Sequence, residues 1–394
     1  MDAKNLFSLL KERSAEIISA ESLRKRLARR RNLRVKLGID PTTPDLHLGH
    51  VVPLLLLRAF QDAGHQAVLI IGDFTGQIGD PAGKLATRRQ LTPGEAKANA
   101  RTYRRQIGRI LNLSRTEVRR NSEWFSKMRL ADFLKILMQF PLAAAVERED
   151  FQKRFRAGKS VGLHEAMYPV LQAYDSVAVR ADVELGALDQ RLNLLAGREL
   201  QSKLGRTPQD IVLLPYLIGL DGSEKMSKTA GNTINLRDGA GDMFGKVMAV
   251  PDRLIINYAE LAAWLPLPAV RSIRRRLAGR ENPRDIKFDV AEAVVRLHHG
   301  TAAARRAREG FLALFSRREV PRSLPAAKVK PGSYSGLGLL EALRACSSRS
   351  EARRLIAGGA VEVDGRVVGG TSGTVAVHSG SIIRVGKKKF FRVA

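Results

Sequence analysis

The chain has 394 residues, 44% of them hydrophobic, and its 67 Lys and Arg against 39 Asp and Glu give a formal net charge of +28. This length suits two or three domains with buried cores, and the charge favours a polyanionic partner such as nucleic acid, with general solubility charge as the alternative. Cys346 is the only cysteine, which excludes an intramolecular disulfide and a zinc site made of cysteines; no apolar run approaches the roughly 20 residues of a membrane span, and without signal-peptide features at the start we expect a cytoplasmic protein.

Residues 1–237 show the pattern of an α/β domain. Short apolar runs typical of buried strands alternate with longer stretches of helical periodicity. This order predicts parallel strands joined by crossover helices. The strand candidates are "RVKLGI" at 34–39, "QAVLIIGDF" at 66–74, "DSVAVRADVEL" at 175–185 and "DIVLLPYLIGL" at 210–220.

The pattern changes after residue 237. Residues 238–318 predict amphipathic helices with basic outer faces, as in "AVRSIRRRLAG" and "DVAEAVVRLHHG". Residues 319–336 combine proline, serine and charge without periodicity, as linkers do. Residues 337–394 return to short helices followed by alternating strands, which predicts a third, small α+β domain.

The motif "HLGH" follows the first strand candidate and the turn-forming "DPTTPD". A helix is expected to begin at Leu48 or Gly49, with Pro53 in its first turn. His47 and His50 then lie at a helix N-terminus, where unpaired N–H groups and partial positive charge attract phosphate. Gly49 lets a ligand approach the backbone. A metal-binding pair and two ordinary capping histidines are the alternatives.

Two basic loops extend this site. In "DGSEKMSKTAGN", after the last strand candidate, Lys225 and Lys228 lie three apart and could clamp a pyrophosphate leaving group, although a solvated basic loop is the alternative. Lys84 and Arg88 follow the second strand candidate in the Gly-rich stretch "GDPAGKLATRR". Because ligands in open α/β sheets bind at the carboxyl ends of strands, these elements together predict one nucleotide site.

The motifs resemble those of bacterial tyrosyl-tRNA synthetases, which are class I aminoacyl-tRNA synthetases. "HLGH" at 47–50 and "KMSKT" at 225–229 match the two class signatures, and "GDFTGQIGDPAGK", "YPVLQAYDSVAVRADVELGALDQ" and "NPRDIKF" are also similar. The tail segment "SRSEARRLIAGGAVEVDGRVV" resembles a small RNA-binding domain that these enzymes share with some ribosomal proteins. The resemblance covers nearly the whole chain.

The resemblance implies a fold and an activity. It implies a Rossmann-like parallel-sheet catalytic domain over 1–237, an α-helical anticodon-binding domain over 238–318, a linker over 319–336 and the small α+β RNA-binding domain over 337–394. The enzyme would activate L-tyrosine with ATP, accompanied by Mg²⁺, to tyrosyl-adenylate and pyrophosphate. It would then transfer tyrosine to the terminal adenosine of tRNA(Tyr) and release AMP. The family also implies a homodimer.

The tyrosine pocket is expected on one helix face. Tyr168, Gln172 and Asp175 are spaced i, i+4 and i+7, on a helix predicted to open with Pro169 in its first turn. An amphipathic helix that turns its polar side to water is the alternative. By resemblance, Tyr168 and Gln172 hold the substrate ammonium group together with Asp80, and Asp175 accepts a hydrogen bond from the phenolic hydroxyl.

The resemblance assigns the other site residues in groups. The catalytic residues are Thr42, His47, His50, Lys84, Arg88, Lys225, Lys228 and Thr229. The ATP-binding residues are Gly38, Asp40, His47, Gly49, His50, Lys225, Met226, Lys228 and, at the ribose, Asp189, while Gln190 faces the tyrosine carboxylate. The RNA-binding residues of the tail are Arg349, Arg353, Arg354, Lys387, Lys388 and Lys389, because a small basic domain suits a structured RNA. No dedicated carboxylate site for a metal is recognised.

Three positions depart from the family pattern. Lys36 aligns where some relatives carry a tyrosine that reaches the phenolic hydroxyl, which leaves the second partner of that hydroxyl open. Ala187 replaces a glycine near the expected ribose, and Thr229 replaces a common serine but keeps the hydroxyl. Elsewhere, Trp124 lies in an apolar helical stretch and is expected in the core.

Three other functions compete with this interpretation. Small nucleotidyltransferases also pair an "HxGH" element with ATP, but they lack the "KMSKT" loop and the tail. A tryptophanyl-tRNA synthetase would share the fold and both signatures, and the set Tyr168, Gln172 and Asp175 argues against it. A non-enzymatic RNA-binding descendant of a synthetase would keep the fold without catalysis, yet every expected catalytic position is filled.

Overall fold

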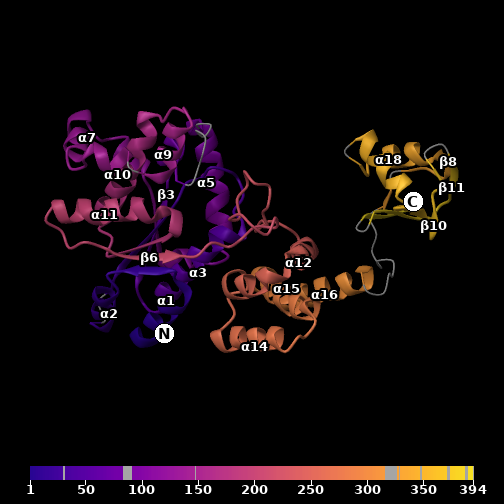
Figure 1. Ribbon diagram of the computed structural model, residues 1–394, viewed down its shortest axis with the longest axis horizontal. Coiled ribbons are helices and arrows are strands. Elements are labelled where there is room, and N and C mark those ends of the chain that lie inside the picture. Colours follow the sequence, from indigo (N-terminus) through magenta and orange to yellow (C-terminus); the bar gives the residue numbers. More distant parts are fainter. Residues whose placement is uncertain are drawn as a thin grey trace. The chain divides into compact units, whose positions relative to one another are not determined.

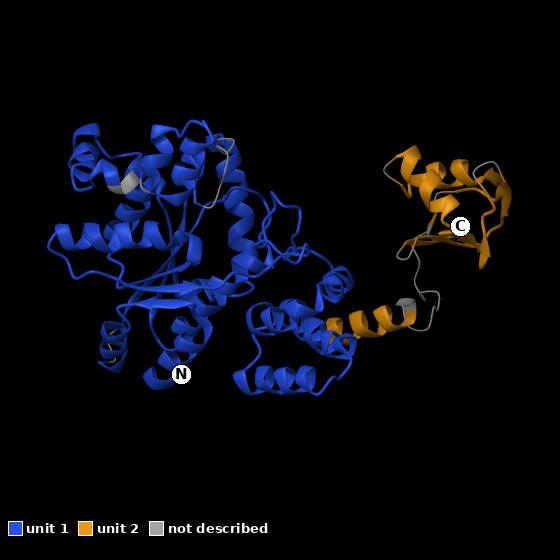
Figure 2. Cartoon of the chain, in the orientation of Figure 1, with its two compact units in different colours: residues 1–301 blue, residues 302–394 orange. Residues whose placement is uncertain are grey.

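The computed structural model divides the chain into two compact units, Met1–Thr301 and Ala302–Ala394 (Figures 1 and 2). It describes residues 1–29, 32–82, 91–146, 148–315, 326–327, 329–346, 348–370, 373–386 and 389–393. The division into catalytic domain, helical domain, linker and RNA-binding domain stays a prediction.

The first unit is built on a sheet of strand order β1-β6-β5-β2-β3-β4. Its strands are β1 (Glu16–Ile18), β2 (Arg34–Ile39), β3 (Gln66–Ile71), β4 (Thr116–Arg120), β5 (Val183–Ala187) and β6 (Asp210–Leu214). β2 to β6 pair in parallel, and β1 joins β6 antiparallel at the edge. The apolar strands β3 and β6 are buried along most of their length because helices cover both faces of the sheet. The predicted α/β class with a parallel-sheet core is confirmed.

Helices lie on both sides of this sheet, with α10 and α11 on one side and α1 and α2 on the other (Figure 1). The helices around the sheet are α1 (Ala3–Arg13), α2 (Ala20–Ala28), α3 (Leu48–Asp62), α4 (Thr75–Ile78), α5 (Pro93–Ile107), α6 (Ser122–Phe125), α7 (Leu130–Leu137), α8 (Leu142–Val146), α9 (Glu149–Arg156), α10 (Leu163–Ala178) and α11 (Arg191–Lys203). They are followed by α12 (Ala240–Ala249), α13 (Ile255–Asn257), a π-helical turn (Tyr258–Ala262), α14 (Leu267–Ala278), α15 (Pro283–His299) and α16 (Thr301–Phe315). In the described part of the chain, no helix is both long enough and apolar enough to cross a membrane.

The sheet differs from the sequence prediction at two strands. The run 175–185 was expected to be one strand, but its first residues complete α10, and a left-handed turn at Arg180, with φ of 51°, separates them from β5. β4 was missed because "TEVRR" carries a single apolar residue and forms a half-exposed edge strand. The strand that was missed matters, since residues just after it enter the functional site.

Helix α3 begins at Leu48, as expected, but the prolines of α3 and α10 lie further from the helix starts than the sequence suggested. Pro53 and Pro169 were placed in first turns, but each lies in the second turn of its helix. For α10 the start is fixed at Gly162, whose N–H donates to Glu165 Oε2 at 2.8 Å. This bond satisfies a backbone donor that the helix leaves unpaired.

The second unit has its own sheet and core. The strand order β10-β9-β12-β13-β7 joins β7 (Ala326–Ala327), β9 (Val361–Val363), β10 (Arg366–Val367), β12 (Ile382–Val385) and β13 (Lys389–Val393), and β8 (Gly332–Ser335) pairs with β11 (Thr374–Val377). Helices α17 (Gly336–Ala342) and α18 (Arg349–Ala357) accompany these strands. Leu339, Ile356 and Ile383 belong to one buried apolar cluster. The predicted small α+β unit is therefore present.

Separate cores predict separate responses to mutation. Ile211→Ala removes a buried side chain from the first unit and Ile383→Ala removes one from the second. We expect each to lower the free energy of unfolding of its own unit by about 2–5 kcal/mol, since each leaves a cavity. Urea denaturation followed by hydrogen exchange can report the units separately. A single transition that both substitutions shift equally would contradict this independence.

Candidate active site

The cavity that contains the predicted site opens where the strand order reverses. β2 is followed by β3 on one side and flanked by β5 on the other, so the carboxyl ends of β2 and β5 leave a crevice between their loops. The cavity has a volume of about 290 Å³. Predicted residues that line it are Gly38, Asp40, Thr42, His47, Gly49, His50, Asp80, Tyr168, Gln172, Asp175, Asp189, Gln190, Lys225 and Met226.

Two described residues of the "KMSKT" signature stand apart from that lining. Lys228 and Thr229 belong to the same loop as Lys225 but are not part of the cavity wall. Lys84 and Arg88 lie outside the described residues, as do Lys387 and Lys388 of the tail. The structure thus brings both signatures to one cavity, together with the tyrosine set.

The "HLGH" segment lies against the loop that follows "KMSKT". Leu48 N–H donates to Ile234 O, and Leu236 N–H donates to Leu46 O, both at 2.9 Å. A Cβ on Gly49 would lie 3.0 Å from the His47 ring, so glycine leaves room for the ring. Backbone hydrogen bonds therefore join the first signature to the segment that follows the second.

The two histidines form a compact pair at the start of α3. Their ring centroids lie 3.9 Å apart, and His47 N–H donates to His50 Nδ1 at 3.3 Å. Burial lowers the pKa of His47 to about 2, and His50 and Lys228 add to the shift. His47 is therefore neutral at physiological pH. Its buried Nδ1 finds no hydrogen-bond partner among the described residues, which leaves it available to a ligand.

The "KMSKT" loop is closed at its base by Asp221 and Asn232. Asp221 accepts hydrogen bonds from the N–H groups of Ser223 and Glu224 at 2.7 and 2.9 Å, and these bonds lower its pKa to about 2. Asn232 donates to Asp221 and accepts from Ser227 N–H at 2.8 Å. These hydrogen bonds fix the two ends of the loop that carries Lys225 and Lys228.

One lysine of the loop already has an anionic partner. Lys225 forms an ion pair with Asp189, the residue predicted to bind the ATP ribose. Burial lowers the pKa of Lys228, and Asp45 opposes that shift. A nucleotide entering the cavity would therefore meet Lys225 in an ion pair and Lys228 with a lowered pKa.

Helix α10 presents the predicted tyrosine set to the cavity. Tyr168 OH donates to Asp40 Oδ2 at 2.9 Å, and Thr75 Oγ1 donates to Asp40 Oδ1 at 2.7 Å. Burial raises the pKa of Tyr168 well above its usual value, and Asp40 adds to the shift, so the phenol stays protonated as a donor. Gly72 makes room for this arrangement, since a Cβ there would lie 1.9 Å from Asp40 Oδ1.

Asp175 is buried at the end of the same helix face and has two partners that the sequence analysis missed. Trp124 Nε1 donates to Asp175 Oδ1 at 3.0 Å, and Asn121 Nδ2 donates to Asp175 Oδ2 at 3.3 Å. Trp124 packs against a core cluster, as expected, and its indole N–H also bonds Asp175, which lines the cavity. Both residues follow β4, so the sequence signal would have been polar groups at a strand end, had that strand been recognised.

Asp80 and Gln190 meet on another side of the cavity. Gln190 Nε2 donates to Asp80 Oδ2 at 2.7 Å, and Gln190 Oε1 accepts from Asn193 Nδ2 at 3.0 Å. Asn193 in turn accepts from Arg148 Nη1 at 3.0 Å. This chain of hydrogen bonds fixes the carboxamide of Gln190 beside the carboxylate of Asp80. Ala187 lies in the cavity wall close by.

The predicted RNA-binding residues that the structure describes lie on the surface of the second unit. Arg349, Arg353 and Arg354 are exposed on α18, and Lys389 is exposed at the start of β13. Arg349 forms an ion pair with Glu341 at 2.6 Å. Within the described ranges, no group of three or more His, Cys, Asp or Glu side chains could hold a metal ion.

Comparison with known proteins gives consistent matches. The model of the family "tRNA synthetases class I (W and Y)" matches residues 28–316, and the S4 domain model matches residues 339–372. The tyrosine–tRNA ligase of Thermotoga maritima is 42% identical over 100% of this chain and 98% of that protein, and that of Moorella thermoacetica is 44% identical over 98% and 94%.

Solved structures show the same fold at lower identity. The tyrosyl-tRNA synthetase of Archaeoglobus fulgidus, complexed with L-tyrosine, has a TM-score of 0.62 and 23% identity, covering 78% of this chain and 100% of that one. The truncated mitochondrial enzyme of Aspergillus nidulans has a TM-score of 0.65 and 19% identity, covering 79% and 94%.

The buried carboxyl of Asp175 predicts a pH-dependent stability. Burial raises its pKa to about 7, Asp40 adds to the shift, and Lys36, Asn121 and Trp124 oppose it. The folded protein thus binds this proton more tightly than the unfolded chain, so its stabilising contribution is full below about pH 4 and is lost as the pH rises to about 7.

Asp175→Asn removes this titration. We expect its melting temperature, relative to that of the unsubstituted protein, to rise by a few degrees between pH 4.5 and pH 8, as thermal denaturation at each pH would show. Gln172→Ala, at the same cavity wall, is the control and should show a constant difference. A constant difference for Asp175→Asn as well would contradict the raised pKa.

Proposed function

The chain belongs to the class I tyrosyl-tRNA synthetases, and on that premise we propose how its residues activate tyrosine and charge tRNA. Its function is that of a tyrosine–tRNA ligase, since relatives over its whole length are tyrosine–tRNA ligases. The observation that carries the mechanism is a single cavity with the α10 residues on one wall and both class signatures on the other. Tryptophan is the less favoured substrate, because the same relatives act on tyrosine.

Tyrosine binds with its phenol against Asp175. Trp124 and Asn121 hold the two oxygens of that carboxylate, which leaves lone pairs to accept the phenolic hydrogen. A site built to bond a hydroxyl rejects an analogue that lacks it, because buried polar groups are left unpaired, as tyrosyl-tRNA synthetases themselves exemplify for phenylalanine. Selection against phenylalanine therefore rests on Asp175.

The other end of tyrosine binds on the opposite side of the cavity. Asp80, Tyr168 and Gln172 receive the ammonium group, and Gln190 faces the carboxylate. The hydrogen bond from Gln190 to Asp80 supports this pairing, because it holds a donor for the carboxylate beside an acceptor for the ammonium. The substrate carboxylate is then presented to the nucleotide.

Tyrosine is activated by ATP, and no protein side chain acts as a nucleophile. The tyrosine carboxylate attacks the α-phosphorus in line, the bond to the β-phosphate bridging oxygen breaks, and pyrophosphate leaves. Catalysis consists of positioning and charge stabilisation. Gly38, Asp40 and Gly49 approach the nucleotide, while Thr42, His47 and His50 bind the phosphates from the start of α3. His47, being neutral, acts as a hydrogen-bond donor rather than a cation.

Two basic loops supply the positive charge. Lys225, Lys228 and Thr229, with Met226 at the nucleotide, close on the departing pyrophosphate, together with Lys84 and Arg88. When the ribose binds Asp189, Lys225 loses its partner and becomes free to contact the phosphates. Nucleotide binding and loop closure are thereby coupled through one ion pair.

Magnesium enters with ATP. Within the described ranges no side-chain cluster fits a resident metal, and Mg²⁺ characteristically takes phosphate and water oxygens rather than a protein cage. No step of the mechanism above is assigned to it.

The second substrate is tRNA(Tyr). A terminal ribose hydroxyl of the tRNA attacks the mixed anhydride and AMP leaves. Supporting observations are the net charge of +28 and the exposed arginines of α18, within the stretch that matches the S4 domain. The helical region 238–318 serves as the anticodon-binding domain, and the S4-like unit extends the RNA contact, with Lys387, Lys388 and Lys389 among its proposed RNA-binding residues. We place this reaction in the cytoplasm, where bacterial tRNA is charged.

A homodimer is supported by an apolar helix face. Leu130, Leu134, Met138 and Leu142 recur every four residues and are 73%, 49%, 81% and 70% exposed. This spacing puts Leu130, Leu134 and the C-cap Met138 on one side of α7, and Leu142 opens the next helix, α8. Contiguous apolar patches of this kind mark protein interfaces, so this α7 face is proposed to meet its copy in a second subunit.

The function is tested by exchange of labelled pyrophosphate into ATP with each amino acid in turn. We expect exchange with tyrosine alone. In Asp175→Ala, exchange should fall at least about a hundredfold in kcat/KM for tyrosine, since a charged buried acceptor is lost, while the KM for ATP changes little. Exchange with tryptophan would overturn the pocket assignment, and equal effects on tyrosine and ATP would contradict the role of Asp175.

The dimer is tested by charge on the α7 face. Leu134→Glu combined with Met138→Glu should convert the dimer to a monomer at micromolar concentration in analytical ultracentrifugation, because charges would be buried without partners. Leu192→Glu, at an equally exposed leucine of α11, is the control and should stay dimeric. A dimer that survives the double substitution would place the interface elsewhere.

A further inference from the structure

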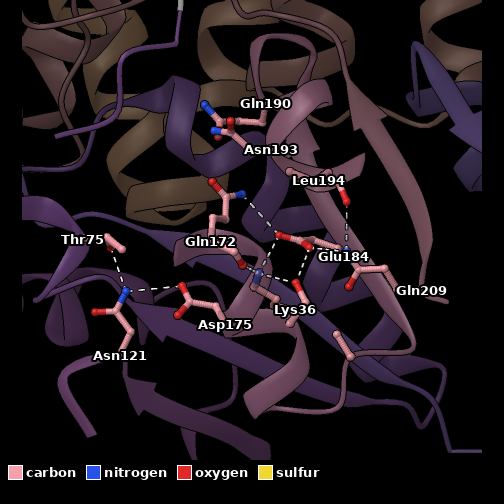
Figure 3. A network of polar contacts seen from close by, with 12 residues as sticks. Lys36, Thr75, Asn121, Gln172, Asp175, Glu184, Gln190, Asn193, Leu194 and Gln209 are labelled. Atoms are coloured by element: carbon pink, nitrogen blue, oxygen red, sulfur yellow. Dashed lines mark hydrogen bonds and ion pairs between the residues drawn. The ribbon is translucent and has the colours of Figure 1, made fainter. Parts of the chain in front are cut away.

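A buried ion pair, Lys36 with Glu184, belongs to a network of polar contacts that also includes Gln172 (Figure 3). Lys36 of β2 and Glu184 of β5 face each other in the register of the sheet, with Nζ and Oε1 2.8 Å apart. The Lys36 side chain is 0% exposed and that of Glu184 is 1% exposed. Lys36 lines the cavity, as do Gln172 and Asp175, so its cation lies at the floor of the pocket.

The hydrogen bonds of Lys36 show that it does not bind substrate directly. Its Nζ donates to Ser176 Oγ at 2.7 Å, to Glu184 Oε1 at 2.8 Å and to Gln172 O at 3.2 Å. An ammonium group has three hydrogens, and these three acceptors use them. The phenolic hydroxyl of tyrosine therefore gains no hydrogen bond from Lys36 unless one of these is broken.

Glu184 is held as tightly as its partner. It accepts from Ser176 Oγ at 2.7 Å, from Gln172 Nε2 at 3.4 Å and from Gln209 Nε2. Helix α11 leaves space for this cluster at Gly197, where a Cβ would lie 2.9 Å from Gln209 Nε2 and 3.0 Å from Ser176 Oγ. The cluster thus joins two strands to α10 in a closed, dry space.

Stability alone does not account for such a pair. Desolvating two charges costs several kcal/mol per ion, and apolar residues of similar volume give equal or greater stability in many proteins. The cluster, however, touches α10 at Gln172 and Ser176, which flank Asp175 on that helix. It also places a buried cation beside the residue next to Asp175, since Lys36 Nζ donates to Ser176 Oγ, and this charge lowers the pKa of Asp175.

We propose that Lys36 is a positioning residue for tyrosine selection, which fixes α10 against β2 through Gln172 and Ser176 and favours the ionised form of Asp175, the form that accepts the phenolic hydrogen. This role rests on the proposed function. In this role Lys36 does not bond the phenolic hydroxyl of tyrosine. It acts on Asp175 instead, and Glu184 balances its charge. Selectivity for tyrosine over phenylalanine then depends on a residue that touches neither substrate.

The charges around Asp175 determine the sign of the expected effect. Lys36 is the cation facing it, and Glu184 balances Lys36. Asp40, at the end of β2, raises the pKa of Asp175, and Tyr168 on its own helix stays protonated. Asn121 and Trp124 donate to it from the segment after β4. Removing Lys36 therefore leaves burial and Asp40 to raise the pKa of Asp175 further.

The test measures tyrosine- and phenylalanine-dependent pyrophosphate exchange from pH 6 to pH 9. In Lys36→Met we expect kcat/KM for tyrosine to fall at least about tenfold at pH 7, with a smaller change for phenylalanine. The acid limb of the tyrosine profile should move up by about one pH unit, so the deficit shrinks towards pH 9. A loss that is equal for both amino acids and independent of pH would overturn the proposal.

A second variant separates electrostatics from stability. Lys36→Met combined with Glu184→Gln removes both charges, so no uncompensated anion is left buried, and its melting temperature should recover relative to Lys36→Met alone. Its acid limb and its tyrosine-to-phenylalanine ratio should stay altered, because Asp175 still lacks the cation. Recovery of both to the values of the unsubstituted protein would show that Lys36 serves stability only.

The control is an ion pair between α2 and β6 whose residues do not line the cavity. Arg26 contacts the buried Asp210 of β6 at 3.4 Å. Arg26→Met should lower the melting temperature without changing the acid limb or the selectivity ratio. If the unsubstituted protein shows no tyrosine-dependent exchange, the proposed function fails and this role fails with it. Normal exchange with unaltered selectivity in both Lys36 variants would overturn the role of Lys36 alone.

Discussion

A buried carboxyl group, that of Asp175, is the constraint around which the tyrosine pocket is arranged. Burial disfavours the charge of Asp175, so donors from separate elements must converge on it. Trp124 and Asn121 reach it from the segment after β4, and Lys36 supports it from the strand below. Because these elements lie far apart in the chain, the pocket exists only when the whole sheet is assembled.

On the nucleotide side of the cavity, two of the groups proposed to bind phosphate carry no unpaired charge in the absence of ATP. Lys225 is neutralised by Asp189, His47 is neutral through burial, and the loop is fixed at Asp221 and Asn232 but not over the cavity. Few charges therefore need a partner before ATP arrives. Binding of the ribose and phosphates supplies the new partners, and the energy of rearrangement comes from the substrate itself.

The sequence predicted what is local and periodic. The bounds of β2 were correct, and both signatures lie at one cavity, because apolar runs and loop motifs are legible in a short window. What it missed depends on pairing at a distance. β4 carries too few apolar residues to be recognised, so Asn121 and Trp124 could not be assigned, and the acceptors of Lys36 come from α10 and β5. The roles of the site residues remain proposals.

The pairing of β1 with β6 also has a consequence for how the chain is made. Glu16 lies opposite Leu213, so a strand synthesised at the outset waits until more than half of the chain has emerged before its edge is satisfied. Parallel sheets with such remote pairings fold slowly and expose unpaired edges meanwhile. During translation the backbone N–H and C=O groups of β1 therefore lack their partners until β6 has been synthesised.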